Sequence, residues 1–151
     1  MGYFIRAILC NRLLANEIIE DNSYAKSIEI YNDLFLIPFI DELFDEINEF
    51  EQSQNVGKFI LLTEKINDYL KQFSSKGKIA YIEADYFGGV GFQNAIVWDN
   101  QETVFYEENA DWAINKALKF IGIVKDKDKF DEFDTVGLGK FRDTEAWYEC
   151  N

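Results

Sequence analysis

The spacing of apolar and polar residues predicts a mixture of strands and helices. Residues Tyr3–Cys10 are rich in Phe, Ile and Leu and alternate imperfectly with polar positions, as a half-buried strand does. Residues 78–87 alternate more strictly. Tyr81, Glu83 and Asp85 share one face, whereas the other face is apolar and consists of Ala80, Ile82, Ala84 and Tyr86. The first of these faces is expected to be polar and accessible.

Turn-forming residues divide the other apolar runs into hairpins. The run from Ile28 predicts two strands joined at Asn32-Asp33, and the only proline, Pro38, fits the end of an edge strand. Residues 78–87, 93–99 and 103–106 predict three consecutive antiparallel strands. Glycines at 88, 89 and 91 would make the first connection, and Asp99-Asn100 the second.

Apolar residues at helical spacing predict helices outside these strands. A helix capped by Asp41 is expected to run to Phe50, and others are expected over 62–73 and 109–121. A short helix fits 13–19, and another begins at Thr144. Because hairpins and separate helices mix, the predicted class is a single α+β domain over 1–151, an antiparallel sheet (meander) with helices packed against it.

Composition and charge exclude several functions. The 151 residues carry a net charge of −13. This disfavours nucleic acid and anionic membrane surfaces as partners, because both are bound through clustered Lys and Arg. The chain contains no histidine, so Ser-His-Asp and Cys-His catalysis and the commonest zinc ligand are excluded. The apolar start is expected to be a strand rather than a signal peptide, which places the protein in the cytoplasm with Cys10 and Cys150 as reduced thiols.

Two motifs suggest ligand sites but fail in detail. Residues 87–92, FGGVGF, have predicted strands on both sides and no following Gly-Lys-Ser/Thr, so they indicate a hairpin rather than a phosphate loop. Residues 126–134 resemble an EF-hand, but Phe130 and Asp131 occupy positions that need an oxygen ligand and glycine. No cofactor and no metal site is therefore expected.

The acidic residues are unevenly distributed. Residues 27–57 contain eight carboxylates and residues 79–115 contain seven, and neither stretch has a Lys or Arg. The helix predicted from Asp41 lacks the Lys or Arg four residues on that usually pairs with an acid. Unpaired acids near aromatic residues indicate a surface for a basic partner, since complementary fields speed encounter and fix orientation.

An enzymatic interpretation remains open at this point. Glu83 and Asp85 lie on the same strand face, within roughly 7 Å of each other by strand geometry. Paired carboxylates of this kind could act as acid and base in glycoside hydrolysis.

The C-terminal half resembles a known group of proteins. The segments KIAYIEADYFGGVGFQNAIVW, AINKALKFIGI and DEFDTVGLGKFRDTEAW are similar to small bacterial immunity proteins encoded beside secreted polymorphic toxins, of the contact-dependent growth inhibition type. The resemblance implies a non-enzymatic cytoplasmic inhibitor that occludes a cognate toxin domain, often a basic nuclease. The alternatives are a Smi1/Knr4-like scaffold and a carboxylate-based hydrolase, and self-association stays open. The expected partner-binding residues are Asp41, Glu42, Asp45, Glu46, Glu49, Tyr81, Glu83, Asp85, Phe87 and Phe92.

Overall fold

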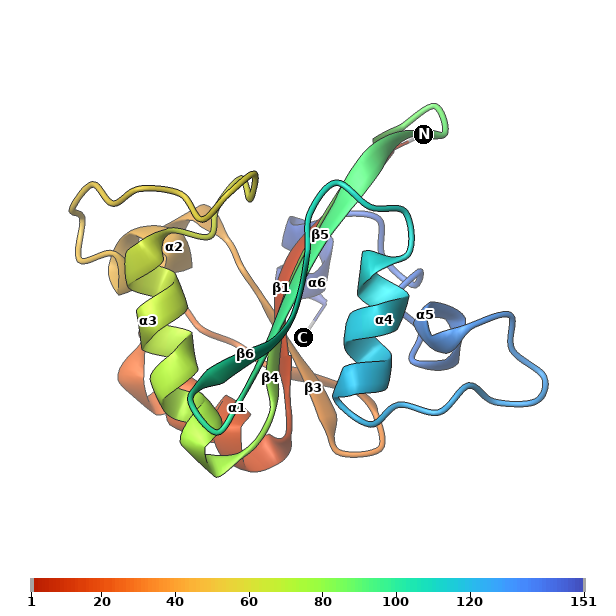
Figure 1. Cartoon of the computed structure of the whole chain (residues 1–151), viewed down its shortest axis with the longest axis horizontal. Helices are drawn as coiled ribbons and strands as arrows, with labels where there is room; N and C mark the ends of the chain where they lie inside the picture. The colour runs from red at the N-terminus through yellow and green to blue at the C-terminus, as the bar shows by residue number, and fades with distance from the viewer. Residues whose placement is uncertain (1, 151) are drawn as a thin grey trace.

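Six strands form one antiparallel sheet through the middle of the molecule (Figure 1). The computed structural model describes residues 2–150. The strand order is β2-β3-β1-β4-β5-β6, and every neighbouring pair is antiparallel. The predicted α+β class and the meander β4-β5-β6 are confirmed. The strands are β1 (Gly2–Cys10), β2 (Ile28–Tyr31), β3 (Leu34–Pro38), β4 (Ile79–Phe87), β5 (Val90–Asp99) and β6 (Glu102–Glu107).

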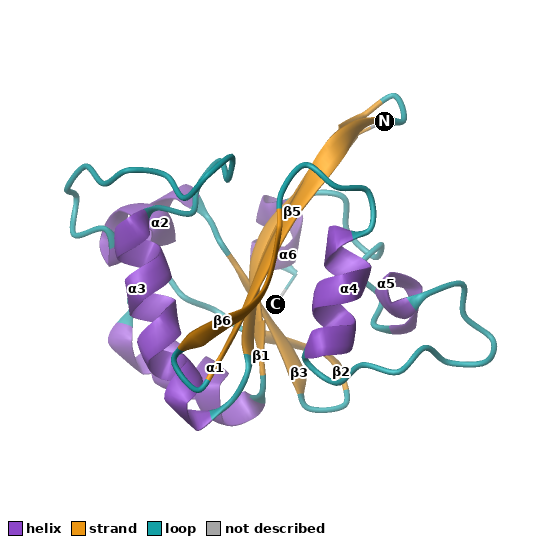
Figure 2. Cartoon of the chain, viewed as in Figure 1, coloured by secondary structure: helices purple, strands orange, loops and turns teal. Residues whose placement is uncertain are grey.

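Helices cover both faces of this sheet, as Figure 2 shows. The helices α1 to α3 bury one apolar cluster against the first face, and α4 to α6 bury a second cluster against the other. None of the helices within residues 2–150 is both long enough and apolar enough to cross a bilayer. The α-helices are α1 (Arg12–Asp21), α2 (Asp41–Ile47), α3 (Glu64–Phe73), α4 (Ala113–Phe120), α5 (Glu132–Thr135) and α6 (Thr144–Glu149), and a 3₁₀ turn follows α3 (Ser74–Lys76).

Tight turns join the hairpins close to where the sequence predicts them. Asn32 and Asp33 separate β2 from β3, as expected. Gly88 and Gly89 connect β4 to β5 with φ values of 62° and 81°, which glycine adopts without steric cost. FGGVGF is therefore a hairpin. The turn before β6 is at Asn100-Gln101, one residue beyond the expected position, and both residues have positive φ.

Pro38 ends β3, although β3 is an inner strand. On its outer side, β2 pairs only with Leu34–Leu36. Pro38 therefore has no strand partner on that side and needs no backbone donor there.

The helix predicted from Asp41 to Phe50 differs from α2 at both ends. Ile40, not Asp41, occupies the N-cap, and Asp41 lies in the first turn, where its charge complements the helix dipole. The helix ends at Ile47, because Glu49 and Phe50 take positive φ values of 56° and 58°. Phe50, the expected last residue of the helix, lies outside it and is 81% exposed.

The helices after β6 agree only in part with those that the sequence predicts. The helix α4 begins at Ala113 rather than Asn109, and Asn109 itself has positive φ. The helix α5 was not predicted, because it has only four residues and lies within a charged segment. The helix α6 begins at Thr144, as expected, and buries Trp147.

The two cysteines are free and differ in accessibility. Cys10 is buried in β1, and burial raises the pKa of its thiol to about 12, whereas Cys150 is exposed. Because the thiolate is the reactive form, we expect Cys150 to react with a disulfide reagent at pH 8 more than about 100-fold faster than Cys10. Thiol titration of the native protein should show one fast group, and a second only after denaturant is added. Two fast groups would contradict the burial of Cys10.

Candidate partner-binding surface

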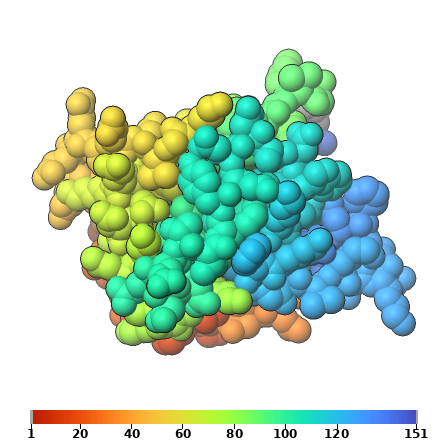
Figure 3. Space-filling model, in the orientation of Figure 1, coloured from red at the N-terminus to blue at the C-terminus, as the bar shows by residue number. Residues whose placement is uncertain are grey.

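The β4–β5 hairpin carries exposed apolar side chains at its tip. Phe87 and Val90 flank the Gly88-Gly89 turn and are 77% and 78% exposed. The hairpin projects beyond the helices at the top of Figure 1, and its tip stands clear of the rest of the molecule in Figure 3. Exposed aromatic and aliphatic groups on a projecting element are typical of a protein-binding site.

Strand pairing places further residues in a row behind the tip. Asp85 of β4 pairs with Phe4 of β1 on one side and with Phe92 of β5 on the other. Directly opposed residues in an antiparallel pair share a face, so the three side chains lie side by side. Phe4 is exposed, and the other two are half-buried. We call Phe4, Asp85, Phe87, Val90 and Phe92 the hairpin surface.

Arg6 connects the hairpin surface to the start of α2. Its guanidinium lies over the Phe4 ring, 4.9 Å from the centroid, and 3.5 Å from an Asp41 carboxylate oxygen. Arg6 itself is buried, whereas Asp41 is 78% exposed in its side chain. Asp41, Glu42 and Asp45, all exposed, form what we call the acidic turn. The acidic turn and the hairpin surface are thus joined through one buried cation.

Glu46 and Glu49, also expected to meet a partner, have contacts within the chain. The Glu46 carboxylate accepts hydrogen bonds from the backbone N–H groups of Ser23 and Tyr24, at 2.8 and 3.0 Å. Glu49 lies 2.6 Å from the Lys65 ammonium, which lowers the pKa of Glu49. Both carboxylates are therefore less available to a cationic partner than those of Glu42 and Asp45, which have no Lys or Arg within 4.0 Å among residues 2–150.

Tyr81 and Glu83 were expected on an accessible face, and this expectation is wrong. They are 0% and 1% exposed, because residues 58–62 cover this part of the sheet. The pKa of Tyr81 is raised well above its ordinary value, mainly by burial and secondly by the nearby Glu83 carboxylate. Neither side chain can contact a partner without movement of the covering segment. Asp85, two residues further along β4, is half-buried and lies on the hairpin surface.

Four hydrogen bonds saturate the Glu83 carboxylate. It accepts from the backbone N–H groups of Ile60 and Leu61, each at 2.8 Å, from the Tyr81 hydroxyl at 2.7 Å, and from the Asn94 amide at 3.1 Å. No lone pair direction remains open toward a substrate. The pairing of Glu83 with Asp85 as a catalytic acid and base therefore has no support in the geometry.

Part of the acidic excess is neutralised by cations from other segments. Of the 15 carboxylates in the two stretches (8 plus 7), five lie within 4.0 Å of a Lys or Arg among residues 2–150. The other ten include Glu42, Asp45 and Asp85. The uncompensated negative charge is therefore smaller than the sequence suggests, and Glu42 and Asp45 of the acidic turn are part of what remains. The five paired residues are Glu29, Asp41, Glu49, Glu51 and Glu107.

Carboxylates elsewhere do not assemble into a metal site. Within the described part of the chain, no group of three or more His, Cys, Asp or Glu side chains is arranged to hold an ion. In the segment that resembles an EF-hand, Asp131 caps α5 through the Asp134 N–H, and Asp134 accepts from the Phe130 N–H. These acids stabilise the local backbone.

Comparison with known proteins adds no relative: no family model, no curated protein and no solved structure matches the chain. The candidate surface therefore depends on its own geometry.

Of its residues, Phe4, Arg6 and Val90 were missed by sequence reasoning. Phe4 and Arg6 become part of the surface only through the register of β1 with β4, which no local pattern reveals. Val90 could have been found from its place beside two turn-forming glycines.

Proposed function

We propose that this chain is a non-enzymatic immunity-type protein that binds a cognate, basic toxin domain in the cytoplasm and occludes its active site or an adjacent surface. The observation that carries the proposal is the hairpin surface, where Phe87 and Val90 are more than three-quarters exposed and Asp85 has no Lys or Arg within 4.0 Å among residues 2–150. The resemblance of the C-terminal half to immunity proteins supports the same function.

The two parts of the surface would contribute differently to binding. Apolar side chains buried at the centre of an interface supply most of the affinity. Exposed acids at the rim mainly raise the association rate and select orientation. Phe87, Val90 and Phe92 are thus the expected anchors, while Glu42 and Asp45 would attract Lys and Arg of the toxin. In a nuclease, those cations would otherwise hold nucleic acid.

A binding assay with the toxin domain encoded beside this chain tests the proposal. We expect a stable complex at micromolar concentration in low salt, and loss of toxin activity on complex formation. Absence of a complex under these conditions would refute the proposal. Tight binding to several unrelated proteins, with no toxin among them, would favour a scaffold function.

Charge reversal at the acidic turn should slow association. For Glu42→Lys with Asp45→Lys, we expect the association rate constant to fall about fivefold in low salt, and its dependence on salt to weaken, because long-range attraction is lost. Stopped-flow measurements from 20 to 500 mM salt give both quantities.

The matched control is Asp126→Lys with Asp128→Lys, which makes the same change of net charge on an exposed loop remote from the hairpin (Figure 1). If both double variants slow association equally, net charge alone steers the encounter and the acidic turn has no local role.

A further inference from the structure

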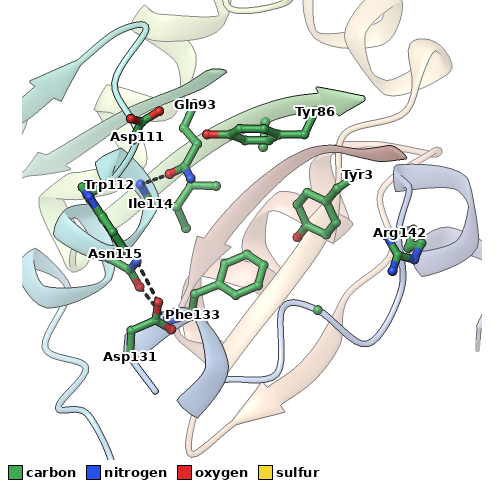
Figure 4. Close-up of a pocket in the computed structure, with 12 residues that line it drawn as sticks. Tyr3, Tyr86, Gln93, Asp111, Trp112, Ile114, Asn115, Asp131, Phe133 and Arg142 are labelled. Carbon is green, nitrogen blue, oxygen red and sulfur yellow. Dashed lines mark hydrogen bonds between the residues drawn. The ribbon is translucent and has the colours of Figure 1, made fainter. Parts of the chain in front are cut away.

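A second candidate site lies on the opposite face of the sheet. A cavity of about 410 Å³ opens between strands β1, β4 and β5 on one side and residues 111–142 on the other (Figure 4). This volume is within the range of sites that hold small organic ligands. None of its lining residues belongs to the hairpin surface or to the acidic turn. A ligand in this cavity would therefore not compete directly for the residues proposed to bind a toxin.

Four aromatic side chains line the cavity. The rings of Tyr3 and Phe133 pack edge to face, with centroids 5.6 Å apart, and the Tyr3 hydroxyl donates to the Leu138 carbonyl oxygen at 2.9 Å. The other two are Tyr86 of β4 and Trp112, which immediately precedes α4 and is 55% exposed. The faces of aromatic rings carry partial negative charge, so they attract cations as well as apolar groups.

Two carboxylates add a full negative charge each, and no ion pair offsets them. Neither Asp111 nor Asp131 has a Lys or Arg within 4.0 Å among residues 2–150. The Asp131 oxygens accept hydrogen bonds from the Asp134 N–H at 2.8 Å and from the Asn115 amide at 3.2 Å. Both donors are neutral, so they hold the Asp131 carboxylate in place without cancelling its charge. Each of its oxygens also keeps capacity for a further hydrogen bond.

The basic side chain in the lining, Arg142, lies away from these acids. Figure 4 shows Asp111, Trp112 and Asp131 on one side of the cavity. Arg142 lies on the other side, beyond Tyr3 in the same view, and is exposed to solvent. We call Asp111, Trp112 and Asp131 the acidic end. It combines two carboxylates and an accessible indole ring, and contains no Lys or Arg.

We propose that the acidic end of this cavity binds a small organic cation, an ammonium group attached to an apolar or aromatic body. The ammonium would lie against the Trp112 ring, where cation–π attraction adds to the field of the two carboxylates. It need not touch both acids, because charges act over roughly 8 Å at physiological salt. The body of the ligand would cover the rings of Tyr86 and Phe133 and bury apolar area there. The proposal does not depend on toxin binding.

Calorimetric titration at pH 7 with three related probes tests it. The probes are 2-phenylethylammonium, the neutral 2-phenylethanol and the anionic 3-phenylpropanoate. For the cation we expect a Kd on the order of 1 mM, as suits a ligand of this size. The alcohol should bind about fivefold more weakly, because it loses cation–π and charge attraction but keeps the same ring. The anion should bind more weakly still.

Charge removal at the acidic end should abolish most of this preference. For Asp111→Asn with Asp131→Asn, we expect the cation to bind less than twofold better than the alcohol, while the affinity for the alcohol stays unchanged. Asn caps a helix as well as Asp does, so α5 should remain intact. The matched control, Asp126→Asn with Asp128→Asn, removes the same charge from an exposed loop outside the cavity and should keep the fivefold preference.

An aromatic substitution tests the cation–π contribution separately. Trp112→Leu keeps an apolar side chain but removes the ring, so it should reduce the preference for the cation over the alcohol about twofold. Trp112→Phe should restore part of that preference. Arg142→Gln should not weaken binding of the cation, because this residue lies at the other side of the cavity.

Three results would overturn the proposal. The first is the absence of saturable binding of 2-phenylethylammonium at 10 mM by the wild-type protein. The second is binding of the alcohol or the anion as tightly as the cation. The third is an undiminished preference for the cation in the Asp111→Asn, Asp131→Asn double variant. None of these results bears on the toxin-binding assay, so failure here is distinguishable from failure of the proposed function.

Discussion

Replacing Glu83 with alanine is expected to lower the free energy of unfolding by about 2 to 4 kcal/mol, the largest stability effect that we foresee for a single polar substitution. The carboxylate is buried and is the sole recorded acceptor for the Ile60 and Leu61 N–H groups and the Tyr81 hydroxyl. Each buried donor left unsatisfied costs about 1 to 3 kcal/mol. The substitution also releases the segment that covers Tyr81, so part of the loss is local opening that admits water.

Urea denaturation of three variants separates this effect from a general effect of removing an acid from β4. Glu83→Gln keeps one acceptor oxygen and should be destabilised less than Glu83→Ala. Asp85→Asn removes a carboxylate two residues along the same strand, where no side-chain hydrogen bond is recorded, and should stay within about 0.5 kcal/mol of the wild type. If Glu83→Ala matched Asp85→Asn, the carboxylate would not hold residues 58–62 as the structure indicates.

Local chemistry accounts for the parts of the fold that the sequence predicts well. Alternation in β1 and β4 and the turn residues Asn32-Asp33 and Gly88-Gly89 act within a few residues, so a short window contains the whole signal. The same holds for Thr144, which begins α6 after the Asp143 cap. These elements form where propensity and tertiary packing agree.

The face of β4 could not be predicted for a different reason. Alternation places Tyr81 and Glu83 together on one face, which is correct, but it does not say what covers that face. The cover is residues 58–62, which have no periodic pattern and no regular secondary structure before Thr63. A polar residue in a strand was therefore interpreted as exposed, although its partners were backbone donors more than 20 residues away in the chain.

Charge pairing shows the same limit. In the sequence, no Lys or Arg lies four residues after Glu49. The structure shows that α2 ends before Glu49 and that Lys65 of α3 pairs with it from another element. Likewise, the buried Arg6 reaches Asp41 from β1. Counting charges along the chain overestimates the free negative charge, because a folded chain brings cations from distant segments. After this correction, Glu42 and Asp45 of α2 and Asp85 of the hairpin surface remain among the acids with no Lys or Arg within 4.0 Å in residues 2–150.

The opposite faces of the sheet offer two chemically different sites. The hairpin surface is convex, apolar at its tip and bordered by acids, which suits a protein partner. On the other face, a cavity of about 410 Å³ lies between the sheet and residues 111–142. Its lining includes four aromatic side chains and two carboxylates, Asp111 and Asp131, that have no Lys or Arg within 4.0 Å among the described residues. Since β4 contributes Phe87 to the first and Tyr86 to the second, substitutions in this strand need readouts for both.

Phe87→Ala is expected to weaken binding of the toxin domain by about 30-fold or more, the largest effect on affinity that we foresee. Phe87 lies at the hairpin tip, where it is 77% exposed, so its truncation removes little packing from the free protein. Aromatic residues buried at the centre of an interface commonly contribute 2 kcal/mol or more. Most of the loss should appear as faster dissociation, because the substitution removes contact area and leaves the charges unchanged.

Surface plasmon resonance with the toxin domain measures this effect, and two comparisons make the result specific. Phe130→Ala removes an equally exposed phenylalanine (78%) from the loop between α4 and α5 and should bind as the wild type does. Urea denaturation of Phe87→Ala should give a free energy of unfolding within about 0.5 kcal/mol of the wild type, because the ring makes little contact in the folded chain. Wild-type affinity of Phe87→Ala would place the toxin contact away from the hairpin, whatever the behaviour of the acidic turn.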